Sequence, residues 1–235
     1  MFRFKRFSVE NERACLKVGT DAVLLGAAMD LDKVSFEGLK ALDIGTGTGV
    51  IALMAAQRLE EAGLNDYFID AIDIDAPSAE EARDNFFASP WKDHLLSVHS
   101  SLQDFEKEAG QYGPIFSNPP YYDCSLRNPE ARQASARHTD SLSYREICAF
   151  AKDHLLPEGR MCIILPSEQR LALNRLASSF GLYPQRIVDI FTSAKKPSRR
   201  IIAEFAKEKA EVLADDILIG SEAHRFLMEK FLLSI

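Results

Sequence analysis

The stretch "ALDIGTGTGVIALMAA", residues 41–56, joins a short apolar run to a glycine-rich turn and the start of a helix. Three glycines let the backbone turn tightly and let a ligand approach without side-chain collision: Gly45, Gly47 and Gly49. A dinucleotide fingerprint, G-x-G-x-x-G, would need glycine where the chain has Val50. The observed spacing, with Asp43 two residues before the first glycine, therefore favours a ligand without phosphates whose cationic amino-acid end meets a carboxylate.

Short apolar runs alternate with amphipathic stretches along the rest of the chain. The pattern predicts strands at 39–45, 67–74, 95–100, 114–118, 160–166, 184–193 and 199–207. It predicts helices at 21–29, 49–62, 76–89, 143–156, 167–180 and 221–233. Such alternation is typical of an α/β, Rossmann-like fold with helices on both faces of the sheet. We expect a mainly parallel seven-stranded sheet that ends in an antiparallel C-terminal hairpin.

Length and composition favour a single domain over residues 1–235. The 235 residues are 46% hydrophobic and 27% charged, and residues 1–38 form an N-terminal extension expected to cap the ligand pocket. No apolar run reaches the roughly 18 residues that span a bilayer, and the N-terminus does not resemble a secretory signal. The four cysteines form no C-x-x-C pair, so no metal site is predicted. We expect a cytoplasmic monomer without metal.

A second acidic position follows in the next predicted strand, which ends in "AIDID". Asp73 lies 24 positions after Gly49, where a carboxylate can accept both hydroxyls of an adenosine ribose. Asp75 is the neighbouring candidate and ranks second.

With Asp43, the three glycines and Asp73 in place, the chain resembles the class I S-adenosylmethionine-dependent methyltransferases over about residues 20–207. The resemblance implies S-adenosylmethionine as cofactor, bound at the glycine turn and at Asp73. The family commonly places an acid beside the adenine, where this chain reads "HSSLQDF" with Leu102 at the expected position. Gln103 or Asp104 is the substitute we expect there.

The motif "SNPPYYD", residues 117–123, ends a buried strand on two prolines, neither of which can donate a backbone hydrogen bond. It resembles the signature of enzymes that methylate a planar nitrogen. Asn118 and the carbonyl of Pro119 can each accept one N–H bond from an exocyclic amine and point its lone pair at the methyl group. Tyr121 offers a face on which a flipped base can stack.

A narrower resemblance rests on three stretches: "KVGTDAVLLGA" (17–27), "NPPYY" (118–122) and "KKPSRRIIAEF" (195–205). They are similar to the bacterial family that methylates N6 of the adenosine next to the anticodon, adenosine 37, of a valine tRNA. In that family the segment "VGTD" leads into the cofactor pocket, which implies that Gly19, Thr20 and Asp21 line it.

Basic residues are clustered although the formal net charge is −7. One cluster occupies a predicted turn, and a second follows the NPPY motif: Lys195, Lys196, Arg199 and Arg200, then Arg127, Arg132 and Arg137. Solvated surface charge is the ordinary explanation of each cluster alone. Their expected position near the pocket mouth favours contacts with tRNA phosphates.

The leading hypothesis is therefore a tRNA adenine-N6 methyltransferase. An N-methyltransferase acting on guanine in ribosomal RNA or on a protein glutamine stays open, because both share the chemistry. A nicotinamide-dependent oxidoreductase is disfavoured by Val50 and by the lack of a Tyr-x-x-x-Lys relay. A non-catalytic RNA-binding module is disfavoured by the intact Asp43, Asp73 and Asn118.

Overall fold

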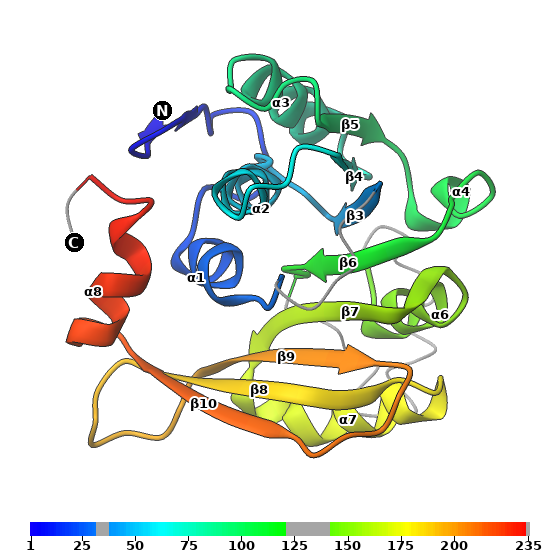
Figure 1. Cartoon of the computed structure of the whole chain (residues 1–235), viewed down its shortest axis with the longest axis vertical. Helices are drawn as coiled ribbons and strands as arrows, with labels where there is room; N and C mark the ends of the chain where they lie inside the picture. The colour runs from blue at the N-terminus through cyan, green and yellow to red at the C-terminus, as the bar shows by residue number, and fades with distance from the viewer. Residues whose placement is uncertain (32–37, 121–141, 234–235) are drawn as a thin grey trace.

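A computed structural model of the chain describes residues 1–31, 38–120 and 142–233. The central sheet has eight strands in the order β10-β8-β9-β7-β6-β3-β4-β5 (Figure 1). These strands are β3 (Leu39–Ile44), β4 (Tyr67–Asp73), β5 (Leu95–His99), β6 (Tyr112–Ser117), β7 (Leu155–Pro166), β8 (Tyr183–Phe191), β9 (Arg200–Ala206) and β10 (Leu213–Leu218).

Only β9 runs antiparallel to its neighbours in this sheet. The parallel pairs β3–β4, β4–β5, β3–β6 and β6–β7 form the half of the sheet that the glycine turn belongs to. The expected C-terminal hairpin is confirmed as β8 and β9, with β9 inserted between β8 and β7.

The prediction of seven strands was wrong by one strand. β10 extends the sheet by pairing parallel with β8 at its edge. Its sequence, LADDIL, is exposed over its first four residues and carries two adjacent aspartates, so it lacks the apolar run that marks the other strands. Charged, exposed edge strands of this kind give a weak periodic signal.

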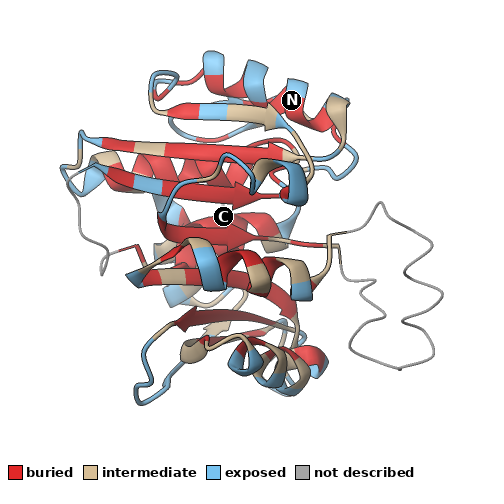
Figure 2. Cartoon of the chain, turned by 90° about the vertical axis from the view of Figure 1, so that its right-hand side faces the viewer, coloured by how far each residue is buried: buried red, intermediate tan, exposed pale blue. Residues whose placement is uncertain are grey.

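Helices cover both faces of the sheet (Figure 1). One apolar cluster joins the sheet to α1 (Thr20–Ala28), α2 (Val50–Glu61), α3 (Ala76–Phe87) and α8 (Glu222–Glu229). A second cluster on the other face joins it to α4 (Leu102–Phe105), α6 (Tyr144–His154) and α7 (Arg170–Ser179), which follows the short 3-10 turn η2 (Ser167–Gln169). Figure 2 shows the buried residues concentrated in the sheet and on the helix faces that meet it.

The N-terminal segment forms a small antiparallel ribbon of β1 (Phe2–Arg3) and β2 (Ser8–Val9). The rings of Phe4 and Phe7 stack with centroids 4.4 Å apart, and Phe7 meets the buried Trp91 edge-on. The Lys5 amide donates to the Phe231 carbonyl at 2.8 Å, so this ribbon lies against the C-terminal segment.

Residues 10–15 are then held by one polar face of α3. The carboxylate of Glu81 is 1% exposed and accepts hydrogen bonds from the backbone amides of Glu12, Arg13 and Ala14, at 2.8, 3.0 and 2.7 Å. Asn85 accepts from the Glu10 amide at 2.8 Å and donates to the Glu10 carbonyl at 2.9 Å. These side chains lie about one helical turn apart, which fixes the path of a segment more than 60 residues away in sequence.

Burial alone would raise the pKa of Glu81, but the three backbone donors and the Arg13 guanidinium lower it below its ordinary value of 4.5. A depressed pKa means that the ionised form stabilises the folded state. This contribution is present above the pKa of the unfolded chain and is lost as pH falls through the lower pKa of the folded protein.

We predict that Glu81→Gln lowers the free energy of unfolding by about 1–3 kcal/mol near neutral pH, because a charged acceptor of three hydrogen bonds is replaced by a neutral amide. The difference from wild type should shrink as pH falls below about 4.5. Urea unfolding over a pH series measures both effects. Glu80→Gln, which changes an exposed neighbour, is the control. We call the three hydrogen bonds from residues 12–14 to Glu81 the Glu81 clamp, and an equal effect of both substitutions would contradict its role in stability.

Candidate functional site

The glycine turn lies between β3 and α2, where the chain reverses direction at the carboxyl end of β3. Gly45, Gly47 and Gly49 have φ angles of 72°, 57° and 80°, a region that only glycine occupies without strain. A Cβ on Gly49 would lie 2.5 Å from a ring carbon of Phe86, so this glycine also allows α2 and α3 to pack closely. The turn predicted from the sequence is therefore required by the backbone and by the packing.

Hydrogen bonds tie this turn to the end of β4. The amides of Gly45 and Thr46 both donate to the Ile72 carbonyl at 2.9 Å. Asp73 Oδ2 accepts from the Gly47 amide at 2.8 Å, and Asp73 Oδ1 accepts from the Asp75 amide at 2.9 Å. Burial raises the pKa of Asp73, and these two donors oppose the rise.

Asp75 has a different role from Asp73 in the described structure. Its Oδ2 accepts from the Ser78 amide at 3.0 Å and the Ser78 hydroxyl at 2.6 Å, so it caps the first turn of α3. Both side chains line the same cavity, but the carboxylate of Asp75 is committed to the cap. Both aspartates therefore accept hydrogen bonds from the protein, and the ranking of Asp73 above Asp75 stays a prediction.

Asp43 is completely buried beneath the turn and does not line the cavity. Its Oδ2 accepts from the Thr46 hydroxyl at 2.7 Å, while its Oδ1 has no hydrogen-bond partner among the residues that the structure describes. Burial raises the pKa of Asp43 to about 7, and the Thr46 hydroxyl opposes the rise. That Asp43 meets the amino-acid end of a ligand stays a prediction.

The end of β6 also contributes residues to the site. The buried Ser117 hydroxyl donates to the Ile44 carbonyl at 2.7 Å and so fixes the end of β6 beside the end of β3. Asn118 follows, half-buried, and then the buried Pro119. Because β3 and β6 are neighbours although two strands separate them in sequence, this is the point where the strand order reverses and where α/β sheets bind ligands.

These elements enclose a cavity of about 380 Å³ at the carboxyl ends of β3, β4 and β6. It brings together five of the predicted site residues: Gly45, Gly47, Asp73, Gln103 and Asn118, with the predicted catalytic Pro119 beside them. Residues of the N-terminal segment that the sequence did not single out also line it: Cys15, Leu16 and Lys17. The Glu81 clamp described above is what places this segment over the cavity.

Gln103 and Leu102 form part of the cavity wall beyond β5, whereas Asp104 does not line it. The side-chain amide of Gln103 donates to Glu146 Oε1, and Glu146 Oε2 accepts from the Ser143 amide at 2.8 Å. Glu146 also lines the cavity, and sequence reasoning missed it. The signal that could have found it is the capping box formed by Ser143 and Glu146 at the start of α6.

The "VGTD" residues lie beside the cavity rather than on its wall. Gly19 precedes the first turn of α1, and the neighbours Lys17 and Ala22 are the ones that line the cavity. Asp21 Oδ2 instead pairs with Arg200 Nε at 2.9 Å. Gly19, Thr20 and Asp21 are therefore not among the lining residues of this cavity, and that they contact the cofactor stays a prediction.

The predicted RNA-contact set divides into an exposed group and a paired residue. Lys195, Lys196 and Arg199 are exposed in the turn between β8 and β9, whereas Arg200 is half-buried and held by Asp21. The turn is anchored at its base, where the Ser198 hydroxyl donates to Asp189 at 2.6 Å. Four predicted site residues lie outside the described residues: Tyr121, Arg127, Arg132 and Arg137.

Within residues 1–31, 38–120 and 142–233, no group of three or more His, Cys, Asp or Glu side chains is placed to hold a metal ion. No helix in that same part of the chain is long and apolar enough to cross a bilayer.

Comparison with known proteins gives a matching family model and similar relatives over almost the whole chain. The family model for the methyltransferase small domain matches residues 18–186. The tRNA1(Val) (adenine(37)-N6)-methyltransferase of Bacteroides fragilis is 35% identical over 230 residues, covering 96% of this chain and 92% of the relative. The protein of the same name from Cronobacter sakazakii is 37% identical over 225 residues, covering 95% and 89%.

Solved structures agree on the fold. The crystal structure of a predicted O-methyltransferase from Agrobacterium tumefaciens superposes with a TM-score of 0.65, covering 92% of this chain and 99% of that one at 14% identity. At that identity the likeness concerns the fold alone. The family is shown by the sequence relatives, because they are 35–37% identical to this chain over almost its whole length. The chain belongs to the family of tRNA1(Val) (adenine(37)-N6)-methyltransferases.

Proposed function

We propose that this chain transfers a methyl group from S-adenosylmethionine to N6 of an adenosine in tRNA, adenosine 37 of a valine tRNA. The observation that carries the proposal is the position of Asn118 and Pro119, at the end of β6 and on the wall of the cavity built by the glycine turn and Asp73. The names of the relatives support the substrate. We further propose that the protein acts as a monomer in the cytoplasm, where its substrate is found.

The residues of the cavity fit the cofactor. Asp73 is a partly buried carboxylate at the end of β4, where it can accept the ribose hydroxyls. Gly45 and Gly47 present backbone without side chains, which allows a ligand to approach the turn closely. Leu102 and Gln103 provide an apolar face and an amide on the wall where the adenine is expected.

When bound, S-adenosylmethionine supplies an electrophilic methyl group. The task of the protein is to orient an exocyclic amine whose lone pair is delocalised into its ring. The Asn118 side-chain oxygen and the Pro119 carbonyl each accept one N–H of that amine, which turns its lone pair out of the ring plane. The backbone that carries both groups is held before the substrate arrives, because Ser117 ties the end of β6 to β3 and proline restricts the backbone after Asn118.

One ion pair supports a path for the tRNA between the cavity and the turn that joins β8 to β9. Lys17 and Ala22 line the cavity, and Asp21 between them binds Arg200 at the base of the turn between β8 and β9. The exposed Lys195, Lys196 and Arg199 extend from this turn. We propose that they contact phosphates of the tRNA while N-terminal residues close over the cofactor.

We predict that Asp73→Ala weakens S-adenosylmethionine binding by about 10²-fold or more, because two hydrogen bonds to a charged acceptor are lost, each of about 1.5–3 kcal/mol. Titration calorimetry on the folded variant measures the affinity. Asp75→Asn is the matched control, since asparagine retains the helix cap. If Asp75→Asn has the larger effect, the ribose-binding role belongs to Asp75.

We predict that Asn118→Ala binds S-adenosylmethionine normally but lowers the rate of methyl transfer by about 10²–10³-fold, the effect of removing one preorganised catalytic hydrogen-bonding group. The measurement is single-turnover methylation of unmodified tRNA with saturating cofactor, read as N6-methyladenosine by mass spectrometry. Gln111→Ala, an exposed amide just before the start of β6, is the control. Wild-type turnover by folded Asn118→Ala would refute the catalytic role, whereas product on guanine or protein would refute only the substrate.

We predict that replacing Lys195, Lys196 and Arg199 with alanine lowers tRNA affinity and leaves cofactor affinity unchanged. Each lost phosphate contact should flatten the slope of log affinity against log salt by roughly 0.7–0.9. Arg200 is left in place because it is paired with Asp21.

The control for this prediction is a second triple-alanine variant with the same loss of charge, at the exposed residues Lys92, Lys107 and Lys152, which precede β5, β6 and β7. Filter binding of both variants over a salt series compares the slopes. Equal slopes for the two variants would mean that the turn only carries solvated charge.

A further inference from the structure

The side-chain amide of Gln103 contacts an acid that takes no part in methyl transfer itself. Gln103 lies in α4, which closely follows β5, and Glu146 lies in the first turn of α6. The two residues are 43 positions apart in sequence, yet the Gln103 side-chain nitrogen donates to Glu146 Oε1. Both residues line the same cavity as Asp73 and Asn118. The contact therefore joins two separate elements at the wall of the candidate site.

Gln103 lies on the part of this wall that a base joined to the ribose would meet. The Ser100 amide donates to the Asp73 carbonyl at 3.0 Å, so the chain leaving β5 passes directly beside the residue expected to bind the ribose. Leu102 follows, buried and on the cavity wall, and Gln103 comes next. A base attached to that ribose has an apolar side chain and an amide within the same short segment.

The chemistry of Glu146 decides which end of the Gln103 amide is available. A carboxylate can only accept hydrogen bonds, so the end of the amide that faces Glu146 must be its NH₂ group. The amide oxygen is then the other end, and no residue that the structure describes donates to it. Gln103 is exposed, so packing does not hold its side chain. The charge-assisted bond to Glu146 is what sets the orientation of the amide.

Glu146 is in turn held by the start of its own helix. Its Oε2 accepts from the Ser143 amide at 2.8 Å and from the Ser143 hydroxyl at 2.7 Å. The Ser143 hydroxyl oxygen accepts from the Glu146 amide at 3.2 Å, which completes the capping box. One carboxylate oxygen is thus committed to Ser143 and the other to Gln103. Glu146 accepts hydrogen bonds on both sides, which leaves the amide of Gln103 one orientation.

We propose that Glu146 is a positioning residue, which orients Gln103 so that its amide oxygen accepts a hydrogen bond from the 6-amino group of the adenine of S-adenosylmethionine. The inference rests on the proposed function and concerns how the base of the cofactor is selected. A 6-oxo purine has no hydrogen at this position to donate, and it would place its oxygen against the oxygen of Gln103. The pair of Gln103 and Glu146 therefore selects a 6-amino purine over a 6-oxo purine.

The substitution Glu146→Gln should turn the amide of Gln103 around. Glutamine at this position keeps the capping box, because its side-chain oxygen can still accept from the Ser143 amide. Its NH₂ group then faces Gln103 and needs an acceptor, so the oxygen of Gln103 turns toward residue 146. The NH₂ group of Gln103 turns toward the base, where it matches a 6-oxo group and opposes a 6-amino group.

The test compares the binding of S-adenosylhomocysteine, a 6-amino purine, with that of S-inosylhomocysteine, its 6-oxo counterpart. Titration calorimetry on the full-length protein gives the ratio of the two affinities, which should favour S-adenosylhomocysteine at least about tenfold in the wild type. Glu146→Gln should lower this ratio by at least about tenfold. Activity is not needed for this measurement, so it is independent of the tRNA substrate.

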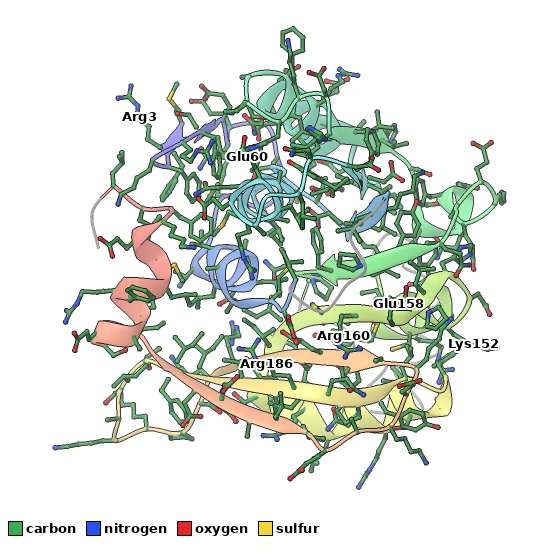
Figure 3. All side chains as sticks on the ribbon, viewed as in Figure 1. Arg3, Glu60, Lys152, Glu158, Arg160 and Arg186 are labelled. Carbon is green, nitrogen blue, oxygen red and sulfur yellow. The ribbon has the colours of Figure 1, made fainter. Side chains whose placement is uncertain are left out.

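An exchange variant, Gln103→Glu with Glu146→Gln, separates orientation from structure. The glutamine at position 146 donates to one oxygen of the new carboxylate, and the other oxygen accepts from the 6-amino group. The ratio should therefore return to within about threefold of the wild-type value. Glu158→Gln, an exposed acid of β7 that Figure 3 labels, removes the same charge outside the cavity and should leave the ratio unchanged.

An unchanged ratio in folded Glu146→Gln would overturn the inference, as would a wild type without preference between the two compounds. An equal loss in Glu146→Gln and in the exchange variant would also overturn it, because a purely structural role of Glu146 predicts that result. If Glu146→Gln does not fold, Gln103→Ala at its exposed position decides, and it should abolish the preference. A wild type that binds neither compound would refute the proposed cofactor, which distinguishes that failure from a loss of selection alone.

Discussion

The hydrogen bond from the Gly47 amide to Asp73 joins the ends of β3 and β4, and the geometry of the candidate site depends on it. Glycine turns lose much conformational freedom on folding, so this one needs external bonds to keep a single shape. The Ile72 carbonyl supplies two of them by accepting from Gly45 and Thr46. The residue expected to bind the ribose therefore also holds the turn on which the rest of the cofactor would lie, and the site is built before any ligand arrives.

Three buried carboxylates differ in how many hydrogen bonds they accept and in the direction in which their pKa is shifted. Glu81 is fully paired with backbone amides, and its pKa is lowered although burial opposes this. Asp43 and Glu204 each keep one oxygen without a partner in the described structure, and burial raises the pKa of both. Glu81 holds a segment in place, whereas Asp43 lies beneath the glycine turn and Glu204 lies within the sheet between β7 and β8. For these two acids burial outweighs the few hydrogen bonds that they accept, which is why their pKa values lie above the ordinary ones.

The sequence predicted the parts of the structure that leave local patterns. Apolar periodicity indicated the central strands, and the glycines revealed a turn that other residues cannot form. It could not predict β10, whose exposed aspartates carry no apolar pattern. Nor could it predict the Glu81 clamp or Glu146 on the cavity wall, because these depend on contacts between distant segments. The buried charge of Glu204 was hidden for the same reason, since "RRIIAEFAK" gives only a strand pattern.

The ion pair of Asp21 and Arg200 shows why charge counted along a sequence is an incomplete guide to RNA contacts. Four basic residues in one short stretch look equivalent in the sequence, yet one of them is half-buried and neutralised by an acid 179 positions away. That pair links the start of α1, next to the cavity wall, to the base of the basic turn. The remaining three charges are exposed and form no ion pair with any residue that the structure describes, and their turn is anchored where Ser198 donates to Asp189. Since the net charge is negative, long-range attraction of RNA to the whole surface is weak, and such a local, anchored cluster is what can orient a tRNA toward Asn118.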